Sequence, residues 1–427
     1  MVKYINHHYS IVLGSLFGDE GKGITTQGLC RNFLNAGKRP IVCRFSGGPQ
    51  AGHTVENNGI RHICSTYGAG TLVGVPTYLT SSFMVDPICL INEYKSLLLE
   101  SVLEGKPQFD IPKLYISSDC RVITPYDVMN GQSDATILKH GTCGKGIFPT
   151  FKRYRKTEGS IFRLIKKDWT FFEVIKHPLD YLNSVKSYYN IMKFDPAYDI
   201  EFIQACNMIR ENRDQFDVRN TDFSHSGLFD EIIYEGSQGL LLDMESGFMP
   251  NCTPSKVGLN GIPGFVFEQD DTDVYLVVRS YLTRHGNGYK PVMARKIFPY
   301  IKGDYETNVN NPWQGEFKIG IFDIDLLNRA FDRAHLNNYN AKFNLVVTHV
   351  DDLHAQRNSD DKENRTRWYY LSNKNLNQIN LFEDKDQSIT EYNFKDAWLK
   401  ILINNIDTVS IQNLYYTDSI DSDLKKW

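Results

Sequence analysis

The sequence predicts an α/β fold with a large, mostly parallel central sheet, flanking helices and insertions. Two observations predict it. The first 45 residues contain a strand, a glycine-rich loop, a helix and a second strand in succession, which is the opening of a parallel α/β sheet. Later apolar runs, at 231–236, 274–283 and 343–350, also end in polar or glycine-rich loops. Since ligands bind where parallel strands end in such loops, these loops are the candidate site.

The elements follow in order along the chain. The apolar run at 10–13 ends in glycine, and apolar residues at Ile24, Leu29 and Phe33 then indicate a helix. The segment "NAGKRP" ends that helix with a glycine, and the run at 41–45 is the next strand. The middle, from 168 to 223, is expected to be helical because it has few glycines. From about residue 358, the chain is rich in Asn, Asp and Lys, which favours exposed loops.

The domain organisation is predicted from what the sequence lacks. It has no internal repeat and no clean linker rich in Pro, Gly or Ser. At 427 residues it can bury a large core. We therefore expect residues 1–427 to form a single domain with a helical insertion at about 168–223.

Composition excludes several functional classes. The chain is 41% hydrophobic and 23% charged, and 47 Lys and Arg against 51 Asp and Glu give a net charge of -4. A general nucleic-acid binder would have a basic excess, so nucleic acid is not an expected partner. The N-terminus lacks an apolar signal region, and no apolar run approaches 18 residues. The eight cysteines are scattered without a C-x-x-C pair. We expect a soluble cytoplasmic protein with free thiols and no membrane partner.

The first loop, "GDEGKG" at 18–23, has the residue types of a phosphate site. Its glycines, Gly18, Gly21 and Gly23, leave backbone N–H groups uncovered at a helix N-terminus, and this arrangement binds anions. Lys22 adds positive charge, and Asp19 suits a Mg²⁺ ligand or a base. The loop is P-loop-like but not a Walker A motif, because Leu16 stands where that spacing requires glycine. The alternative is a tight turn with Asp19 as a helix cap.

The second loop, "SGGPQAGHT" at 46–54, follows the next strand and contains His53. A lone buried histidine is more often structural than catalytic. Here it accompanies Asp19 and Lys22 on an adjacent strand end. A base, an acid and a phosphate-binding lysine together predict a phosphoryl-transfer site.

Taken together, the loops resemble the motifs of the adenylosuccinate synthetase family. Counterparts of its elements occur in the family's order over most of the chain. They are "GDEGKG" at 18–23, "GGPQAGHT" at 47–54, "GTCGKGIFP" at 141–149, "EGSQGLLLD" at 235–243 with "NCTPS" at 251–255, "LTRHGNG" at 282–288 and "VTHVDDL" at 347–353.

The resemblance implies a ligase that joins a 6-oxopurine nucleotide to the amine of L-aspartate. A nucleoside triphosphate, usually GTP with Mg²⁺, first phosphorylates the purine O6, and the amine then displaces phosphate. Asp19 is the implied base and Mg²⁺ ligand, with the carbonyl of Gly52 completing the metal shell. His53 is the implied acid, and Lys22 stabilises the phosphates.

The resemblance also implies three binding sets and a homodimer whose active site is completed by an arginine from the partner. Candidates for the purine nucleotide are Gln50, Thr142, Cys143, Gln238, Thr253 and the two arginines Arg153 and Arg155, either of which could be the dimer arginine. Candidates for the triphosphate are Gly18, Gly21, Gly23, Thr54, His349 and Asp351. Candidates for the amino acid are Arg284, Asn311, Gln314 and Lys318.

Several positions depart from the family pattern. Phe17 replaces a usual tryptophan, Ser46 a glutamine, Gln50 an asparagine and Cys143 a threonine. The aspartate loop at 306–323 has Lys318 as its only cation, where the family has an arginine-rich stretch that suits carboxylates.

These departures leave alternatives open. The substrate is IMP, giving adenylosuccinate, or dGMP, as in a branch of some phages and archaea that makes the succinyl precursor of 2-aminoadenine nucleotides. The donor is GTP, ATP or dATP, because His349 replaces the lysine beside Asp351. Two further readings are a different amine donor and a non-catalytic nucleotide-binding relative. The last would be expected to lack Asp19, Lys22 or His53.

Overall fold

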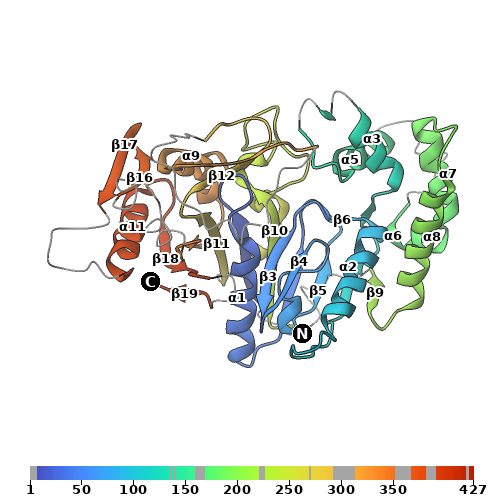
Figure 1. Ribbon diagram of the computed structural model, residues 1–427, viewed down its shortest axis with the longest axis horizontal. Coiled ribbons are helices and arrows are strands. Elements are labelled where there is room, and N and C mark those ends of the chain that lie inside the picture. Colours follow the sequence, from blue (N-terminus) through green and yellow to red (C-terminus); the bar gives the residue numbers. More distant parts are fainter. Residues whose placement is uncertain are drawn as a thin grey trace.

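A computed structural model describes residues 7–134, 137–138, 141–158, 169–220, 227–268, 271–291, 313–351, 367–380, 391–419 and 423–427. Its largest feature is a 10-stranded sheet (Figure 1). The spatial order of the strands is β19 (Lys425–Lys426), β18 (Ile411–Tyr416), β15 (Lys342–Thr348), β11 (Thr272–Arg279), β1 (His8–Gly14), β10 (Glu231–Gly239), β2 (Pro40–Arg44), β5 (Thr77–Leu79), β7 (Leu114–Ser117) and β9 (Phe216–Arg219).

Every neighbouring pair in this sheet is parallel except β18 and β19. The central strand β1 pairs with β10 on one side and β11 on the other, although both are more than 200 residues distant in sequence. The mostly parallel α/β fold predicted from the sequence is confirmed.

The helices cover both faces and both ends of the sheet. In Figure 1, α2 (Pro87–Glu100), α6 (Phe171–Lys176), α7 (Pro178–Tyr189) and α8 (Pro196–Glu211) gather at one end. At the other end lie α9 (Ile324–Arg333) and α11 (Glu391–Asn405). The remaining helices are α1 (Lys22–Asn35), α3 (Pro125–Ser133) and α5 (Ile147–Glu158), and short 3-10 turns are η1 (Thr71–Val73), η4 (Leu240–Leu242), η5 (Leu259–Gly261), η6 (Gly264–Glu268) and η8 (Leu336–Asn338).

The described residues also form four smaller sheets. They are β3 (His53–Asn57) with β4 (Ile60–Cys64), β6 (Met84–Val85) with β8 (Arg121–Val122), β12 (Leu282–His285) with β13 (Phe317–Gly320), and β14 (Phe322–Asp323) with β16 (Arg367–Ser372) and β17 (Asn375–Asn380). The first and third of these extend the loops that carry predicted site residues.

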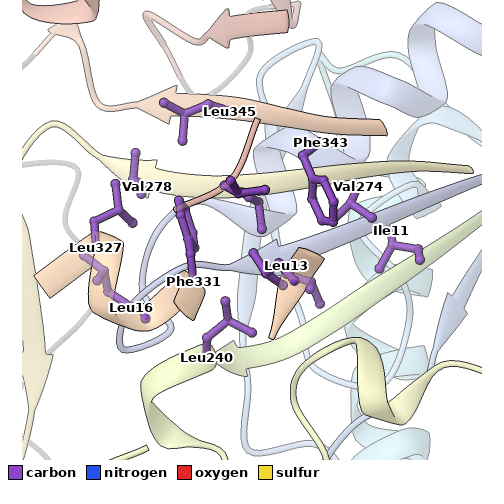
Figure 2. Close-up of a cluster of buried hydrophobic side chains, with 14 of the residues drawn as sticks. Ile11, Leu13, Leu16, Leu240, Val274, Val278, Leu327, Phe331, Phe343 and Leu345 are labelled. Atoms are coloured by element: carbon purple, nitrogen blue, oxygen red, sulfur yellow. The ribbon is translucent and has the colours of Figure 1, made fainter. Parts of the chain in front are cut away.

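Strand β1 is buried on both faces, as a central parallel strand must be. Ile11 and Leu13 point to one face, where they join a cluster with Leu327 and Phe331 of α9 (Figure 2). Val12 points to the opposite face and joins a cluster with Leu29 of α1. Because successive side chains of a strand alternate, the unbroken apolar run is explained by helices on both sides.

Two predictions about segments need correction. The stretch predicted to be helical at 168–223 does contain α6, α7 and α8, but it ends in the edge strand β9. The predicted strand at 274–283 is two strands, β11 and β12, separated at Ser280 and Tyr281. There the Ser280 N–H bonds to the Thr348 carbonyl at 3.1 Å, so the chain leaves one sheet and starts another.

The expectation of exposed loops after residue 358 is wrong for the described part of that region. It contains β16, β17, α11, β18 and β19, and β18 extends the central sheet. Trp398 is fully buried against Phe322 and Tyr370. The polar composition obscured a few large apolar side chains at buried positions.

No helix in the described ranges has the length and hydropathy needed to span a bilayer.

Candidate active site

The predicted catalytic residues and part of the predicted binding residues follow the carboxyl ends of adjacent strands of the central sheet, β15, β1, β10 and β2, with β11 between β15 and β1. Because these strands are parallel, their following loops meet at one edge of the sheet. The loop after β1 carries Asp19, the loop after β2 leads to His53, and Gln238 lies at the end of β10. The fold therefore brings together residues more than 200 positions apart.

The first loop is held open by Glu20. Its carboxylate accepts hydrogen bonds from the N–H groups of Leu16 (2.8 Å) and Gly18 (3.0 Å), which hold the turn from inside. Gly18 and Gly21 have φ of 109° and 92°, the left-handed region that favours glycine. A Cβ at Gly21 would lie 2.8 Å from the Thr348 side chain, so this turn also needs glycine for space.

Lys22 is the first residue of α1 and is buried. Its Nζ donates to the Gly18 carbonyl and lies 3.9 Å from Glu20 Oε2. Burial lowers the pKa of Lys22, and the neighbouring carboxylates oppose that effect. A cation held inside the glycine turn is suited to a phosphate group.

His53 and Glu235 form a buried pair across two strand ends. His53 Nδ1 lies 2.7 Å from Glu235 Oε1, while His53 Nε2 is buried and makes no hydrogen bond with any described residue. Burial lowers the pKa of His53, and Glu235 partly opposes this. Burial raises the pKa of Glu235, but His53 and Arg44 outweigh it, so that this carboxylate stays ionised. The pair orients the ring and leaves Nε2 for a ligand.

Asp19 is the exposed acid of the loop. Its side chain is 27% exposed, and Oδ2 lies 3.9 Å from Nε2 of His285. Arg279 donates from Nε to the Asp19 carbonyl, which fixes the backbone while leaving the carboxylate accessible. An accessible carboxylate with no close cation fits either a base or a ligand of Mg²⁺, which prefers oxygen donors.

Next to Asp19 and His285 lies a cavity of about 680 Å³, a size that suits a nucleotide. Eight predicted residues line it: Gln50, Thr142, Cys143, Arg155, Gln238, Thr253, Arg284 and Gln314. Three of the described lining residues are cations (Lys152, Arg155 and Arg284), and none is acidic. Apolar side chains such as Phe148, Phe151 and Met249 form the rest of the wall.

Arg284 is the most unusual of these cations. It is 6% exposed, and its Nη2 donates to the Asn287 carbonyl at 2.7 Å. Nε makes no hydrogen bond, and no acidic side chain in the described part of the chain forms an ion pair with this guanidinium. Burial lowers the pKa of Arg284 to about 10, so it stays charged at neutral pH. A buried unpaired cation is costly, and an anionic ligand would relieve it.

The structure places other predicted residues outside this cavity. Arg153 is buried, with Nη2 2.8 Å from Asp127 Oδ2 and donating to the Val122 carbonyl, so of the two arginine candidates only Arg155 faces the cavity. Lys318 Nζ donates to the Gly286 carbonyl at 2.6 Å. Asn311 lies outside the described residues.

The predicted triphosphate residues are divided between the end of β15, the first loop and β3. Thr348 Oγ1 donates to the Glu20 carbonyl at 2.7 Å, which joins β15 to the first loop. His349 is half-buried with φ of 57°, and desolvation of its ring lowers its pKa well below the ordinary value. Asp351, two residues after His349, is exposed. Thr54 lies on β3, and Gly23 packs against His53. Gly52, the residue before His53, is exposed.

Comparison with known proteins decides the family. The model of the adenylosuccinate synthetase family matches residues 11–358. The chain belongs to the adenylosuccinate synthetase family. Members of this family are ligases that form C–N bonds, and this chain is an enzyme of that class.

Individual members are distant relatives. The adenylosuccinate synthetase of Halothermothrix orenii is 29% identical over 81% of this chain and 78% of its own length. That of Legionella pneumophila strain Paris is 29% identical over 66% of this chain and 64% of its own.

Solved structures share the fold. Fully ligated adenylosuccinate synthetase from Plasmodium falciparum matches with a TM-score of 0.66 at 18% identity, covering 98% of this chain and 99% of that one. Cyanophage S-2L succinoaminodeoxyadenylate synthetase (PurZ), bound to dGMP and dATP, matches with a TM-score of 0.59 at 15% identity, covering 98% and 95%.

Several residues of this synthetase site escaped prediction from sequence. Glu235 stands in the "EGSQG" motif but was not recognised as the partner of His53. Glu20 and His285 stand in the motifs "GDEGKG" and "LTRHGNG", but the sequence predicted no role for either residue. Their place in motifs was the available signal. The aromatic wall at Phe148 and Phe151 had no sequence signal.

Proposed function

We propose that this synthetase uses Mg²⁺ and a nucleoside triphosphate to join a 6-oxopurine nucleotide to L-aspartate, with IMP giving adenylosuccinate. The observation that carries the proposal is the cavity beside Asp19, whose described lining has three cations and no acid. A nucleotide phosphate and the two carboxylates of aspartate are anions, whereas a purine base needs apolar and amide contacts. The cavity wall offers all of these.

The chemistry is assigned to three side chains of the loops. Asp19 takes the proton from purine N1, so that O6 can attack the γ-phosphate. His53, held by Glu235 through Nδ1, donates from Nε2 to the phosphate oxygens, where negative charge develops. Lys22 stabilises the same charge from inside the turn. Mg²⁺, when bound at Asp19 and the Gly52 carbonyl, neutralises phosphate charge.

Binding roles follow the same geometry. Gln238 and Gln50 contact the purine, while Thr142, Cys143, Thr253 and Arg155 contact its sugar and phosphate. Arg284, with Gln314, takes the carboxylates of aspartate, because its guanidinium is buried in the wall and forms no ion pair with a described acidic residue. The loop after β15, with His349 and Asp351, takes the base of the triphosphate. We also propose a cytoplasmic homodimer, with Arg155 kept in its own cavity.

A second substrate, dGMP, is favoured by Gln50. Its Oε1 is buried and accepts no hydrogen bond from a described residue, and it belongs to the cavity wall. The 2-amino group of a guanine base is a donor that this acceptor could satisfy, whereas the hypoxanthine of IMP has no such group. The phage enzyme PurZ, whose fold is similar, was solved in complex with dGMP and dATP.

Product analysis by mass spectrometry tests the proposal. The protein is incubated with Mg²⁺, L-aspartate and GTP or ATP, against IMP, GMP, dGMP and dIMP in parallel. A succinyl adduct of IMP supports the first substrate, and an adduct of dGMP alone supports the second. Gln50→Leu should reduce turnover of dGMP more than that of IMP. Phosphate release with another amino acid but no aspartate adduct would overturn the assignment of the amine donor.

No turnover with any purine nucleotide would overturn the catalytic proposal as a whole. A ligase should release phosphate only when both the purine nucleotide and the amino acid are present. Release with the triphosphate alone would instead indicate a simple nucleotidase. Binding of IMP and dGMP by calorimetry separates a failed reaction from failed binding.

A further inference from the structure

A second cluster of ligand-type side chains lies outside the active-site cavity, between the β3–β4 hairpin and α2. His62 and Cys64 are on the same face of β4, two residues apart, and Glu93 faces them from α2. One ligand atom from each of these residues lies within 4.8 Å of the others, and all three side chains are buried.

The orientation of His62 is that of a metal-binding histidine. Its Nδ1 lies 2.7 Å from Glu100 Oε2 at the end of α2. Its Nε2 is buried, makes no hydrogen bond with a described residue and lies 3.6 Å from Glu93 Oε1. A carboxylate at one ring nitrogen is the usual second partner of a histidine whose other nitrogen binds a metal.

One spacing within the cluster matches a tetrahedral ion, three of whose four positions these side chains would fill. Two ligands that are each about 2.0–2.1 Å from a tetrahedral Zn²⁺ lie roughly 3.4 Å apart. The 3.6 Å between His62 Nε2 and Glu93 Oε1 is close to that value. The Glu93 carboxylate is itself fixed, because it accepts hydrogen bonds from the N–H groups of Ser65 (3.0 Å), Thr66 (2.6 Å) and Tyr67 (3.1 Å).

We propose that His62, Cys64 and Glu93 form a structural zinc site, with Glu100 orienting the histidine. A thiolate, an imidazole and a carboxylate are a ligand set that Zn²⁺ accepts, whereas Mg²⁺ prefers oxygen donors. Binding converts the Cys64 thiol to a thiolate and releases its proton to solvent. The site is therefore distinct in metal and in place from the Mg²⁺ of catalysis.

The location gives the ion a structural role. Cys64 lies opposite His53 in the β3–β4 ladder, so the hairpin that presents His53 would be tied through the ion to α2. Among the described residues, the alternative to a metal ion is a protonated His62 that forms ion pairs with both Glu93 and Glu100. Only the metal requires the thiol of Cys64, and the test uses this difference.

The test is metal analysis of the full chain produced in zinc-supplemented medium and gel-filtered. We expect about one zinc per chain in the wild type, loss of it in Cys64→Ser, and retention in Cys120→Ser, which removes another buried thiol. Glu100→Gln should weaken zinc affinity about 10–100-fold. Chelation of the wild type should lower its thermal midpoint, with no such shift in Cys64→Ser.

Cobalt substitution of the wild type keeps the test decisive if Cys64→Ser does not fold. A thiolate-to-cobalt charge-transfer band in the near ultraviolet is expected in the wild type and in Cys120→Ser. Zinc content no higher in the wild type than in Cys64→Ser, or cobalt uptake without that band, would overturn the proposal. His62 would then be a protonated bridge between the two glutamates.

Discussion

His53 shows how single residues are tuned at this site. Its ring is buried, which disfavours the charged form, but Glu235 at 2.7 Å restores part of the stability of that form. The net effect lowers the pKa of His53, and Glu235 limits this lowering, which favours the protonated form that a proton donor needs. Asp19, by contrast, remains partly accessible, with His285 as its partner at 3.9 Å, which suits the role of base that we propose.

Asp19→Asn should reduce product formation by about 10²–10⁴-fold, the contribution of a general base, or more if the metal is lost as well. The side chain is partly exposed, so the fold should be unchanged. Rates of succinyl-nucleotide formation, with the thermal midpoint as a control for folding, measure this. Substantial activity in the variant would remove the assignment of Asp19 as the base.

Glu235→Gln should shift the pH profile. The substitution removes the negative charge that raises the pKa of His53, so burial lowers this pKa further. If protonated His53 is the acid, the decline of kcat at high pH should begin at a lower pH than in the wild type. Glu56→Gln, on the same hairpin, is the control and should leave the profile unchanged. An unshifted profile in Glu235→Gln would mean that His53 is not the acid.

The elements act through the strand ends that they join. Thr348 at the end of β15 bonds to the first loop, and Arg279 at the end of β11 bonds to the Asp19 carbonyl, so two neighbouring strands fix the turn. The turn has no room for a larger residue. Its shape therefore depends on elements from the far end of the chain.

Gly21→Ala tests this packing. Both Gly21 and Gly37 have positive φ, but a Cβ at Gly21 meets Thr348 at 2.8 Å while a Cβ at Gly37 meets nothing within 4 Å. Gly37→Ala should cost about 1–2 kcal/mol in free energy of unfolding, from its backbone conformation alone. Gly21→Ala should cost more and should also reduce the catalytic rate, as measured by denaturant unfolding and by turnover. Equal stability losses and unchanged turnover would contradict the contact with Thr348.

His8 joins three strands of the sheet. It lies on β1, with Nδ1 2.6 Å from Glu231 of β10 and Nε2 3.0 Å from Asp273 of β11. Burial lowers its pKa, but these carboxylates outweigh burial and raise it from 6.5 to about 9. This raised pKa contributes stability that is fully present below pH 6.5 and lost as the pH rises through 9.

His8→Gln should therefore make the free energy of unfolding less dependent on pH between 6.5 and 9. The contribution of His8 is at most about 3 kcal/mol, at 1.36 kcal/mol per pKa unit. Denaturant unfolding at several pH values measures it, with the exposed His177→Gln as control. The same slope in wild type and His8→Gln would refute the ion-pair account.

At the scale of the whole molecule, the C-terminal third belongs to the same core as the site. Strand β18 continues the central sheet beside β15, and α11 buries Trp398 against β14 and β16. The loop that binds the triphosphate in our proposal follows β15. Its geometry therefore depends on a region whose composition is mostly polar.

Trp398→Ala should cost about 3–5 kcal/mol, as is typical for a large aromatic residue removed from a core. Trp427→Ala, whose side chain is 45% exposed, should cost much less. Unfolding followed by fluorescence and by circular dichroism should show one transition for the wild type, as expected for the predicted single domain. Two separate transitions would show instead that the C-terminal third unfolds independently.

Local spacing made much of the site predictable. The glycines, Asp19 and Lys22 of the first loop lie within six residues, and their chemistry is readable without knowing any partner. The parallel sheet was predictable because short apolar runs that end in polar or glycine-rich loops are typical of buried parallel strands. The burial of Trp398 was not, since one large side chain among many polar residues leaves composition unchanged.

The sequence by itself determined the α/β class, the resemblance to the synthetase family and most of the loops that meet at the site. Only the tertiary structure decided how these loops combine. His53 and Glu235 are 182 positions apart, and Arg284 is buried without an ion pair to any described acidic side chain because folding removed it from water. Arg153 and Arg155 are two residues apart on α5, yet one pairs with Asp127 and the other faces the cavity. The reason is that burial and pairing arise from contacts distant in sequence, which residue spacing does not encode.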